Sequence, residues 1–191
     1  MPRLTDPVRQ QRMTRIADAA QRCFAREGFA GTSMADIIAE SGMSAGSIYS
    51  HFTGKTDLAR FTATAMLEKR RTSLAELTAS GGTPTPLQVL TRLYGDIAHP
   101  GVAPILVQLW AEAPHNPDLA ELAHHKFTEI RRLLQGTLRP WADTQGPDAE
   151  RLASDAADTI MLLFQGIVIR GSIDPDADSD ALLRAVSRLL R

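Results

Sequence analysis

Between Ser33 and Lys55 the sequence gathers side chains that could bind phosphate groups and the edges of bases. Tyr49 offers a phenolic hydroxyl and Lys55 an ammonium group, and both are suited to phosphate oxygens. Ser33 and Ser44 stand where helices should begin, so their hydroxyls and the free amides nearby add neutral donors. Contacts to phosphate fix the position of a protein on DNA. This stretch therefore predicts a DNA-binding module.

Two short helices joined by a tight turn are expected to position these groups. The first should start directly after Ser33 and end at Gly42, because glycine adopts the left-handed conformation without steric cost. Ser44 can then cap a second helix over residues 45–51, in which Ile48 faces inward. This is the layout of a helix-turn-helix, whose second helix lies in the major groove of DNA.

The outward face of the second helix is the expected reader of base sequence. Ala45, Gly46 and Ser47 are small, so the helix can lie deep in the groove, where methyl and hydroxyl groups meet base edges. His51 could contact DNA or cap the end of the helix, and both remain open. Tyr49 could belong to the core, although the inward positions around it are already occupied. The predicted DNA-binding residues are Ser33, Ser44, Ala45, Gly46, Ser47, Tyr49, His51 and Lys55.

The same stretch resembles the DNA-binding signature of the TetR family of transcriptional regulators, over about residues 9–60. It departs from that signature at Ser41, where alanine is usual, and at Met43, where valine is usual. The resemblance implies an all-α protein, with a three-helix helix-turn-helix domain over residues 1–54 and a helical ligand-binding and dimerisation domain over residues 55–191. The matching pattern is Ile38-Ala39-x-x-Gly42-x-Ser44-x-Gly46-x-x-Tyr49-x-His51-Phe52-x-x-Lys55-x-x-Leu58.

Charge divides unevenly along the 191 residues, although the net charge is only −1. Residues 1–71 carry eleven Lys and Arg against seven Asp and Glu, whereas residues 72–191 carry ten against fifteen. The basic end is thus the predicted DNA end. Basic residues ahead of the module could form an arm that reaches phosphates or a minor groove, or they could be an ordinary solvated helix face. These residues are Arg3, Arg9, Arg12 and Arg15.

Cysteine content and hydropathy predict a cytoplasmic protein without membrane contact. A single cysteine, Cys23, excludes an intramolecular disulfide and is compatible with a reducing compartment. It falls on an apolar stripe with Ile16 and Phe24, so a buried structural role is expected. The first residues lack the apolar core of a signal peptide, and no apolar run approaches the roughly 20 residues that span a bilayer.

Hydrophobic periodicity predicts helices along almost the whole chain. A first amphipathic helix should end at Gly28 and pack across the two short helices. Four phenylalanines at helical spacing, Phe24, Phe29, Phe52 and Phe61, are expected to form the core of this domain. A long helix over 55–79 then joins the two domains. Further helices are expected over 87–98, 103–113, 117–138, 148–170 and 177–190.

The last two predicted helices, near residues 148–190, carry wide apolar surfaces that favour a homodimer. Two such hairpins could form a four-helix bundle across a twofold axis, and a dimer could read a palindromic operator. Packing within one subunit would explain part of the same pattern. The resemblance favours the dimer, since TetR-like proteins dimerise through their last two helices. The predicted contact residues are Ala153, Ala156, Ala157, Ile160, Phe164, Ile167, Leu182, Val186 and Leu189.

Aromatic and apolar residues of the middle helices predict a cavity for a small, largely apolar effector. Aromatic walls with a few polar groups are typical of small-molecule sites, although an ordinary helical core would show the same composition. The resemblance implies such an effector and, as the default of the family, repression. The predicted ligand-binding residues are Tyr94, Leu109, Trp110, His124, Phe127, Phe164 and Gln165.

A helical enzyme or a protein adaptor is the competing class. Glu121 and His125 lie one helical turn apart with His124 beside them, so a metal or an acid–base pair is conceivable. A third ligand is not evident from the spacing, and the sequence contains no HEXXH or Walker A motif. An adaptor would leave Tyr49, Lys55 and the basic end unexplained. We therefore expect no catalytic residue, metal or cofactor.

Overall fold

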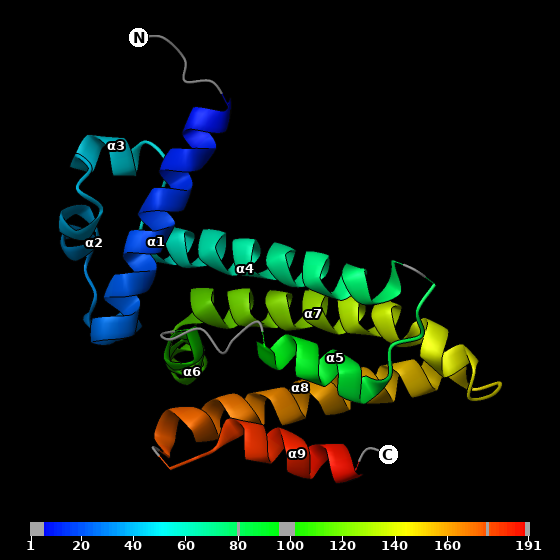
Figure 1. Cartoon of the computed structure of the whole chain (residues 1–191). Helices are drawn as coiled ribbons and strands as arrows, with labels where there is room; N and C mark the ends of the chain where they lie inside the picture. Colours follow the sequence, from blue (N-terminus) through cyan, green and yellow to red (C-terminus); the bar gives the residue numbers. More distant parts are fainter. Residues whose placement is uncertain (1–5, 80, 96–101, 175, 190–191) are drawn as a thin grey trace.

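The computed structural model describes residues 6–79, 81–95, 102–174 and 176–189, and these form an all-α protein without strands (Figure 1). The predicted fold class is therefore confirmed. The last residues of two predicted helices, 96–98 of the helix over 87–98 and residue 190 of the helix over 177–190, lie outside the described residues. The α-helices are α1 (Asp6–Gly31), α2 (Met34–Ser41), α3 (Ala45–Tyr49), α4 (Lys55–Thr78), α5 (Pro86–Gly95), α6 (Val102–Glu112), α7 (Pro117–Asp143), α8 (Ala149–Ile173) and α9 (Ser179–Leu189), with the 3-10 helix η1 (Ala113–His115) before α7.

The first three helices form a small bundle at one end of the molecule, where α2 and α3 lie beside α1 (Figure 1). Gly28 has φ 80° and ψ 164°, so the regular part of α1 ends where the sequence predicts. Ile16, Ile37 and Ile48 are fully buried between the helices. Phe24, Phe29 and Phe52 are buried too, as predicted, whereas Phe61 is half-buried against Phe52, with ring centroids 5.4 Å apart.

Cys23 belongs to the same core, as the apolar stripe predicts. Its side chain is fully buried, and burial raises the pKa of its thiol. The Arg26 guanidinium lies 3.8 Å from the sulfur. A buried, protonated thiol is a poor nucleophile, so Cys23 acts here as an apolar packing residue.

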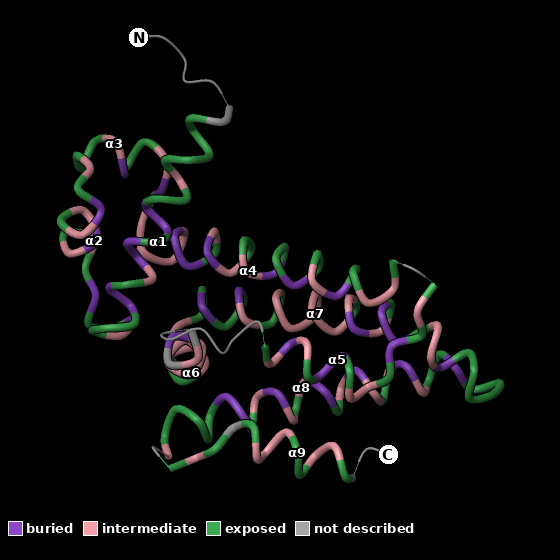
Figure 2. The backbone as a smooth tube through the Cα atoms, in the orientation of Figure 1, coloured by how far each residue is buried: buried purple, intermediate pink, exposed green. Residues whose placement is uncertain are grey.

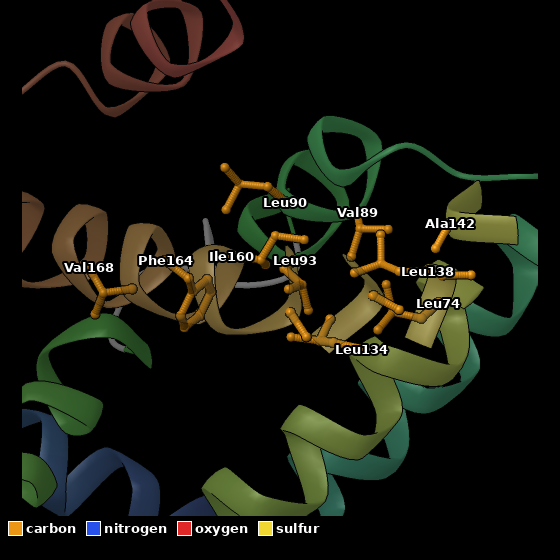
Figure 3. Packing of buried hydrophobic residues seen from close by; sticks show 13 residues of the cluster. Leu74, Val89, Leu90, Leu93, Leu134, Leu138, Ala142, Ile160, Phe164 and Val168 are labelled. Carbon is orange, nitrogen blue, oxygen red and sulfur yellow. The ribbon is translucent and has the colours of Figure 1, made fainter. Parts of the chain in front are cut away.

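A second core fills the space between α4, α5, α7 and α8. Figure 3 shows Leu90 of α5 near Ile160 of α8, and Leu74 of α4 beside Leu138 of α7, within one buried cluster. All four side chains are fully buried. A hydrogen-bonded ion pair also joins α7 to α8, since Arg131 lies 2.6 Å from Oδ1 of Asp158. Figure 2 shows the buried residues facing the interior of this bundle and the exposed ones outside.

Helix α7 is longer than predicted, because it continues past residue 138 to Asp143. Pro140 lies inside this last part of the helix and has no N–H to donate to the preceding turn. Leu138 and Ala142 on either side of it are fully buried. Their burial compensates for the missing hydrogen bond, which a prediction from local sequence cannot anticipate.

The two cores meet at α6 and the start of α7. Ile105, Leu119 and Leu122 are buried in one cluster with Phe24 and Phe29 of the N-terminal bundle. Helix α1 therefore packs directly on α6 as well as on α4. A domain boundary near residue 54 stays a proposal, since apolar contacts continue across it.

Helix α8 is long and apolar enough, by length and composition alone, to cross a membrane. In the structure its buried side chains, Ala153, Ala157, Ile160 and Phe164 among them, pack into the second core. Asp155 and Asp158 interrupt its apolar run. This is the behaviour of a core helix.

Candidate DNA interface and interior cavity

The start of α2 is closed by reciprocal hydrogen bonds between Ser33 and Asp36. The Ser33 backbone N–H donates to Oδ2 of Asp36 at 2.8 Å, and the Asp36 N–H donates to Oγ of Ser33 at 3.2 Å. Such a capping box satisfies amide groups that have no partner inside the helix. The Ser33 hydroxyl also donates to the Asp36 carboxylate. This hydrogen bond and the one from the Ser33 backbone N–H together lower the pKa of Asp36. Ser33 remains exposed at the positive end of the α2 dipole.

The turn between α2 and α3 is held by Gly42 and by two serines. Gly42 has φ 64°, the left-handed conformation that was predicted for it. The buried Ser41 accepts from the Met43 N–H at 3.1 Å and donates to the Ile38 carbonyl at 3.0 Å. The sequence did not lead us to predict this role of Ser41. The available signal was that a serine stands here where the family usually has an alanine. Ser44 caps α3 by accepting from the Ser47 N–H at 3.3 Å.

The outward face of α3 carries small side chains and one aromatic ring. Ala45 and Gly46 are exposed, Ser47 is half-buried, and no atom lies within 4 Å of a Cβ built on Gly46. Tyr49 is 53% exposed, so it does not belong to the core. This face can approach a groove closely, while the phenolic hydroxyl remains free to donate to a phosphate oxygen.

Lys55 uses its ammonium group inside the protein. Nζ donates to the backbone carbonyl groups of Phe29 and Thr32, the latter at 2.9 Å, and lies 4.5 Å from the centroid of the Phe29 ring. Burial lowers the pKa of this lysine. These acceptors belong to the end of α1 and the start of α2, so Lys55 ties α4 to both helices. Phosphate binding by Lys55 stays a prediction, and the observed contacts give it a structural role.

His51 does not cap α3 through Nδ1. This nitrogen is buried without a hydrogen-bond partner, although the residue as a whole is half-buried. Ser50 closes the helix instead, since its hydroxyl donates to the Ser47 carbonyl at 2.8 Å. A contact between His51 and DNA stays a prediction.

The basic residues ahead of the module lie on a helix rather than on an arm. Helix α1 contains Arg9, Arg12 and Arg15, and all three are exposed. They therefore correspond to the second of the two alternatives that the sequence allowed, a solvated helix face. Arg3 lies outside the described residues. Further along α1, Arg22 binds Glu40 of α2 at 2.7 Å, so this pair holds the two helices together.

An apolar cavity of about 120 Å³ lies between α1, α4, α5, α6, α7 and α8. Five of the predicted ligand-binding residues are on its wall: Leu109, Trp110, Phe127, Phe164 and Gln165. The Trp110 and Phe127 rings form a tilted pair, with centroids 6.2 Å apart and an angle of 40° between their planes. Phe24 of α1 also reaches the cavity, so this space touches the N-terminal bundle.

Tyr94 and His124 do not line the cavity, which corrects their predicted placement. On α7 the wall residues Ala123 and Phe127 recur at helical spacing, and His124 is rotated away and exposed. On α5 it is Leu93 that faces the cavity, so its neighbour Tyr94 points elsewhere. Adjacency in sequence placed these residues near the site, but helix rotation separates them from it.

The sequence reasoning missed the polar wall residues of the cavity. Arg70 and Thr62 of α4 are each 8% exposed, and Lys126 of α7 is half-buried. The sequence analysis counted Arg70 only among the basic residues of the N-terminal part of the chain. The available signal for a place on the cavity wall was its position within an otherwise apolar face of the helix. Only the packing of α4 against α7 and α8 brings these groups together.

Most of the predicted dimerisation residues of α8 are already buried within one chain. Ala153, Ala157, Ile160, Phe164 and Ile167 face the core, which corrects their assignment to a surface between subunits. Ala156 on α8 and Leu182 and Val186 on α9 are half-buried, and the side chain of Leu189 lies outside what the structure describes. The outer face of α8 instead presents Leu162, Ile169 and Ile173. Because α8 is apolar on most of its circumference, its sequence does not reveal which face is free.

The residues considered for an enzyme do not form a centre. His125 is exposed, and its Nε2 lies 3.4 Å from Oε1 of Glu129 on the next turn of α7. Within the described ranges, no three His, Cys, Asp or Glu side chains are arranged to hold a metal ion.

Two family models match the chain. Residues 16–60 match the bacterial regulatory proteins of the TetR family, and residues 88–191 match the C-terminal region of BetI-type transcriptional repressors. Among curated proteins, the regulator TtgR of Pseudomonas putida is 40% identical over 58 residues, which are 30% of this chain and 28% of TtgR. The regulator YfiR of Bacillus subtilis is 36% identical over 59 residues, 31% of this chain and 29% of YfiR. These matches thus span less than a third of the length of the curated relatives.

Solved structures are similar over almost the whole chain. GusR of Salmonella enterica is 25% identical with a TM-score of 0.68, covering 99% of each chain. A transcriptional regulator from Saccharomonospora viridis in complex with choline is 22% identical with a TM-score of 0.69, covering 94% of this chain and 95% of that one. The second similarity concerns the fold alone.

Proposed function

Because the chain belongs to the TetR family of transcriptional regulators, we propose that it is a ligand-responsive repressor that binds a palindromic operator as a homodimer. The relatives and the family are regulators rather than enzymes. The observation that carries this proposal is the pairing of an exposed, small-residue face on α3 with a cavity whose wall includes Phe24 of α1. We place the protein in the cytoplasm, where its DNA target would be.

The proposed reading of DNA assigns separate roles to the residues of the module. Ser33, Ser44 and Tyr49 bind phosphate groups and fix the position of the domain, whereas Ala45, Gly46 and Ser47 face the base edges. Exposure of Tyr49 and of the α3 face supports these roles. One such module makes few base contacts, so two modules in a dimer are needed for a specific site.

The proposed dimer forms through α8 and α9. One face of α8 carries three exposed apolar residues, Leu162, Ile169 and Ile173. They share this face because Ile169 follows Leu162 by seven residues and Ile173 follows Ile169 by four. Exposed Gly166 lies near the same face and allows close approach of a second helix. Half-buried Leu182 and Val186 of α9 border this surface in the proposal. An apolar helix face left open to water in one chain is what a partner helix would cover.

The proposed switch couples the cavity to the recognition helices. A small, largely apolar effector would occupy the space between α4, α6, α7 and α8, and would shift α4 and α6 against α1. Only a difference in effector affinity between the two states can move the equilibrium, and a coupling of about 1–3 kcal/mol changes DNA affinity about 5–150-fold. Because α1 packs on both α4 and α6, such a shift would change the spacing of the two modules.

An unbiased selection of DNA fragments on the purified protein tests this function. We expect enrichment of a twofold-symmetric site, and sedimentation velocity should show two chains on one fragment. Fluorescence anisotropy then gives the affinity for that site. Absence of enrichment from a folded protein would contradict DNA binding, whereas enrichment of an asymmetric half-site by a monomer would contradict only the dimer.

A further inference from the structure

We propose that the first turns of α1 bind the phosphate backbone of DNA through a basic strip, formed by Arg9, Arg12 and Arg15, beside the groove that α3 reads. This inference rests on the proposed function, because it assigns further contacts to the same DNA site. It goes beyond the module of α2 and α3, since none of the phosphate contacts proposed there comes from α1.

The charge of the basic strip is not balanced within the protein. Residues 7–17 contain three arginines and no aspartate or glutamate. All three arginines are exposed, and none of them forms an ion pair with a residue that the structure describes. Further along α1, Arg22 and Arg26 both bind Glu40 of α2. The later arginines of α1 thus hold two helices together, whereas the earlier ones face solvent in the free protein and remain available to an anion.

Helix geometry directs two arginines of the strip toward the side of α1 on which the module lies. Ile16 follows Arg9 by seven residues and Arg12 by four, so the three residues share one stripe of α1. Ile16 is fully buried in one cluster with Ile37 of α2 and Ile48 of α3. The arginines on this stripe are exposed, because the first turns of α1 extend out of the bundle at the end where α3 lies (Figure 1).

Arg15 joins the strip to the turn between α2 and α3. Its Nη2 atom lies 3.5 Å from the position that a Cβ atom of Gly42 would occupy. Gly42 ends α2 two residues before Ser44, which caps α3 and is itself a proposed phosphate contact. The basic strip and the proposed DNA surface of the module are therefore continuous.

The strip has the length of a short run of phosphates. Six residues of helix separate Arg9 from Arg15, so at a rise of about 1.5 Å for each residue the strip is about 9 Å long. One DNA strand carries a phosphate about every 3.4 Å of helix axis, so the strip spans about two or three of them. Guanidinium groups bind phosphate through paired hydrogen bonds. Asp18, the first acidic residue after the strip, lies on the opposite side of α1 from Arg9.

The salt dependence of operator binding tests the proposal. Anisotropy titrations of the full chain on its selected site, at about 50–200 mM KCl, give the slope of log affinity against log salt concentration. Arg9→Gln and Arg12→Gln should each make this slope less negative, by about 0.9 for each bound module and so by about 1.8 for a dimer. Over this range each variant should lose about tenfold less affinity than the unmodified protein. The preference among DNA sequences should not change.

Arg132→Gln is the matched control for the strip variants. Arg132 is an exposed arginine of α7 without an ion pair to any described residue, so its replacement removes the same charge away from the module. The slope should stay the same in this control. Circular dichroism should show that all three variants fold, since each replaced side chain is exposed. A slope unchanged by both strip variants, or changed equally by Arg132→Gln, would overturn the proposal.

Ethylation interference identifies the phosphates that the strip contacts. Some phosphates whose ethylation blocks binding of the unmodified protein should no longer interfere with a variant that combines Arg9→Gln and Arg12→Gln. A purely structural role of these arginines would leave the pattern of interfering phosphates unchanged. A change in preferred bases with an unchanged phosphate pattern would place the arginines in a groove and overturn their assignment to the backbone.

The same measurements separate this inference from the proposed function. A folded protein that selects no DNA would contradict the proposed function, and the inference would fail with it. A protein that selects a twofold-symmetric site, with the same salt slope and the same interfering phosphates in the strip variants, would retain the proposed function. Only the contact between α1 and the DNA backbone would then be wrong.

Discussion

The Oε1 atom of Gln108 on α6 lies 3.3 Å from the position that a Cβ atom of Gly28 in α1 would occupy. This oxygen is buried and has no hydrogen-bond partner. The next residue along α6, Leu109, lines the cavity, so one helix carries both the cavity wall and the contact with the end of α1. The close approach joins the proposed effector site to the DNA-binding bundle.

Replacement of Gly28 by alanine should lower the free energy of unfolding by about 1–3 kcal/mol, because φ 80° with ψ 164° is strained for any residue with a side chain. The new methyl group would also press on Gln108. Urea denaturation followed by circular dichroism measures the change. Gly31→Ala is the matched control, since a Cβ there meets only ordinary contacts. Equal effects of the two substitutions would contradict the role of Gly28.

Replacement of Lys55 by alanine should destabilise the protein by about 1.5–3 kcal/mol, since its charged group hydrogen-bonds to carbonyl groups at the end of α1 and before α2. DNA affinity should fall for all sequences as the module loosens. Lys69→Ala, an exposed lysine of the same helix, should leave stability almost unchanged. Unchanged stability of Lys55→Ala with uniformly weaker DNA binding would instead support a direct phosphate contact.

Local sequence was sufficient for the features that depend on neighbours in the chain. Residue types within a few positions determine three of these features: the αL conformation of Gly42, the serine caps of α2 and α3, and the end of the regular helix at Gly28. The acceptors of Lys55 are different. Phe29 and Thr32 lie 26 and 23 residues away, so the tertiary fold decides whether this ammonium faces DNA or the protein.

The site residues that were misplaced share one physical cause. His124 directly follows Ala123, but the 100° of rotation from one helical residue to the next leaves Ala123 on the cavity wall and points His124 to solvent. Helix α8 is apolar on both faces, so composition alone did not separate buried Ala157 from exposed Leu162. Arg70 joins the cavity wall only through the packing of helices distant in sequence.

Removal of the Ser33 hydroxyl by Ser33→Ala should raise the pKa of Asp36 toward its ordinary value, because that hydroxyl is the main cause of its depression. A carboxyl group with a lowered pKa in the folded state adds stability above about pH 4, and this is lost as the pH falls through the lowered value. Carboxyl-carbon NMR over this pH range measures the pKa. Ser172→Ala, which removes a hydroxyl bonded only to a carbonyl of its own helix, should leave Asp36 unchanged.

Replacement of Tyr49 by phenylalanine should weaken binding to every DNA sequence by about 5–150-fold, the effect of losing one hydrogen bond of about 0.5–1.5 kcal/mol in each of the two modules of the dimer. Stability should not change, because the ring is more than half exposed. Ser47→Ala should alter the preference among sequences instead. Anisotropy titrations on the selected site and on single-base variants distinguish the two patterns. A Tyr49→Phe protein with altered preference but full affinity for its best site would reverse these assignments.

Replacement of Leu162 by aspartate should convert the proposed dimer into a monomer, because a charge buried in an apolar interface costs several kcal/mol. The chain should still fold, since this side chain is 70% exposed within one subunit. Sedimentation velocity over a range of concentrations measures the dimer, and the operator affinity should fall with it. Ala157→Leu gives the opposite pattern, because overpacking a fully buried position should cost about 1–3 kcal/mol of stability. A stable dimer of the Leu162→Asp variant would place the interface on another surface, since the exposed face of α8 could not then be its centre.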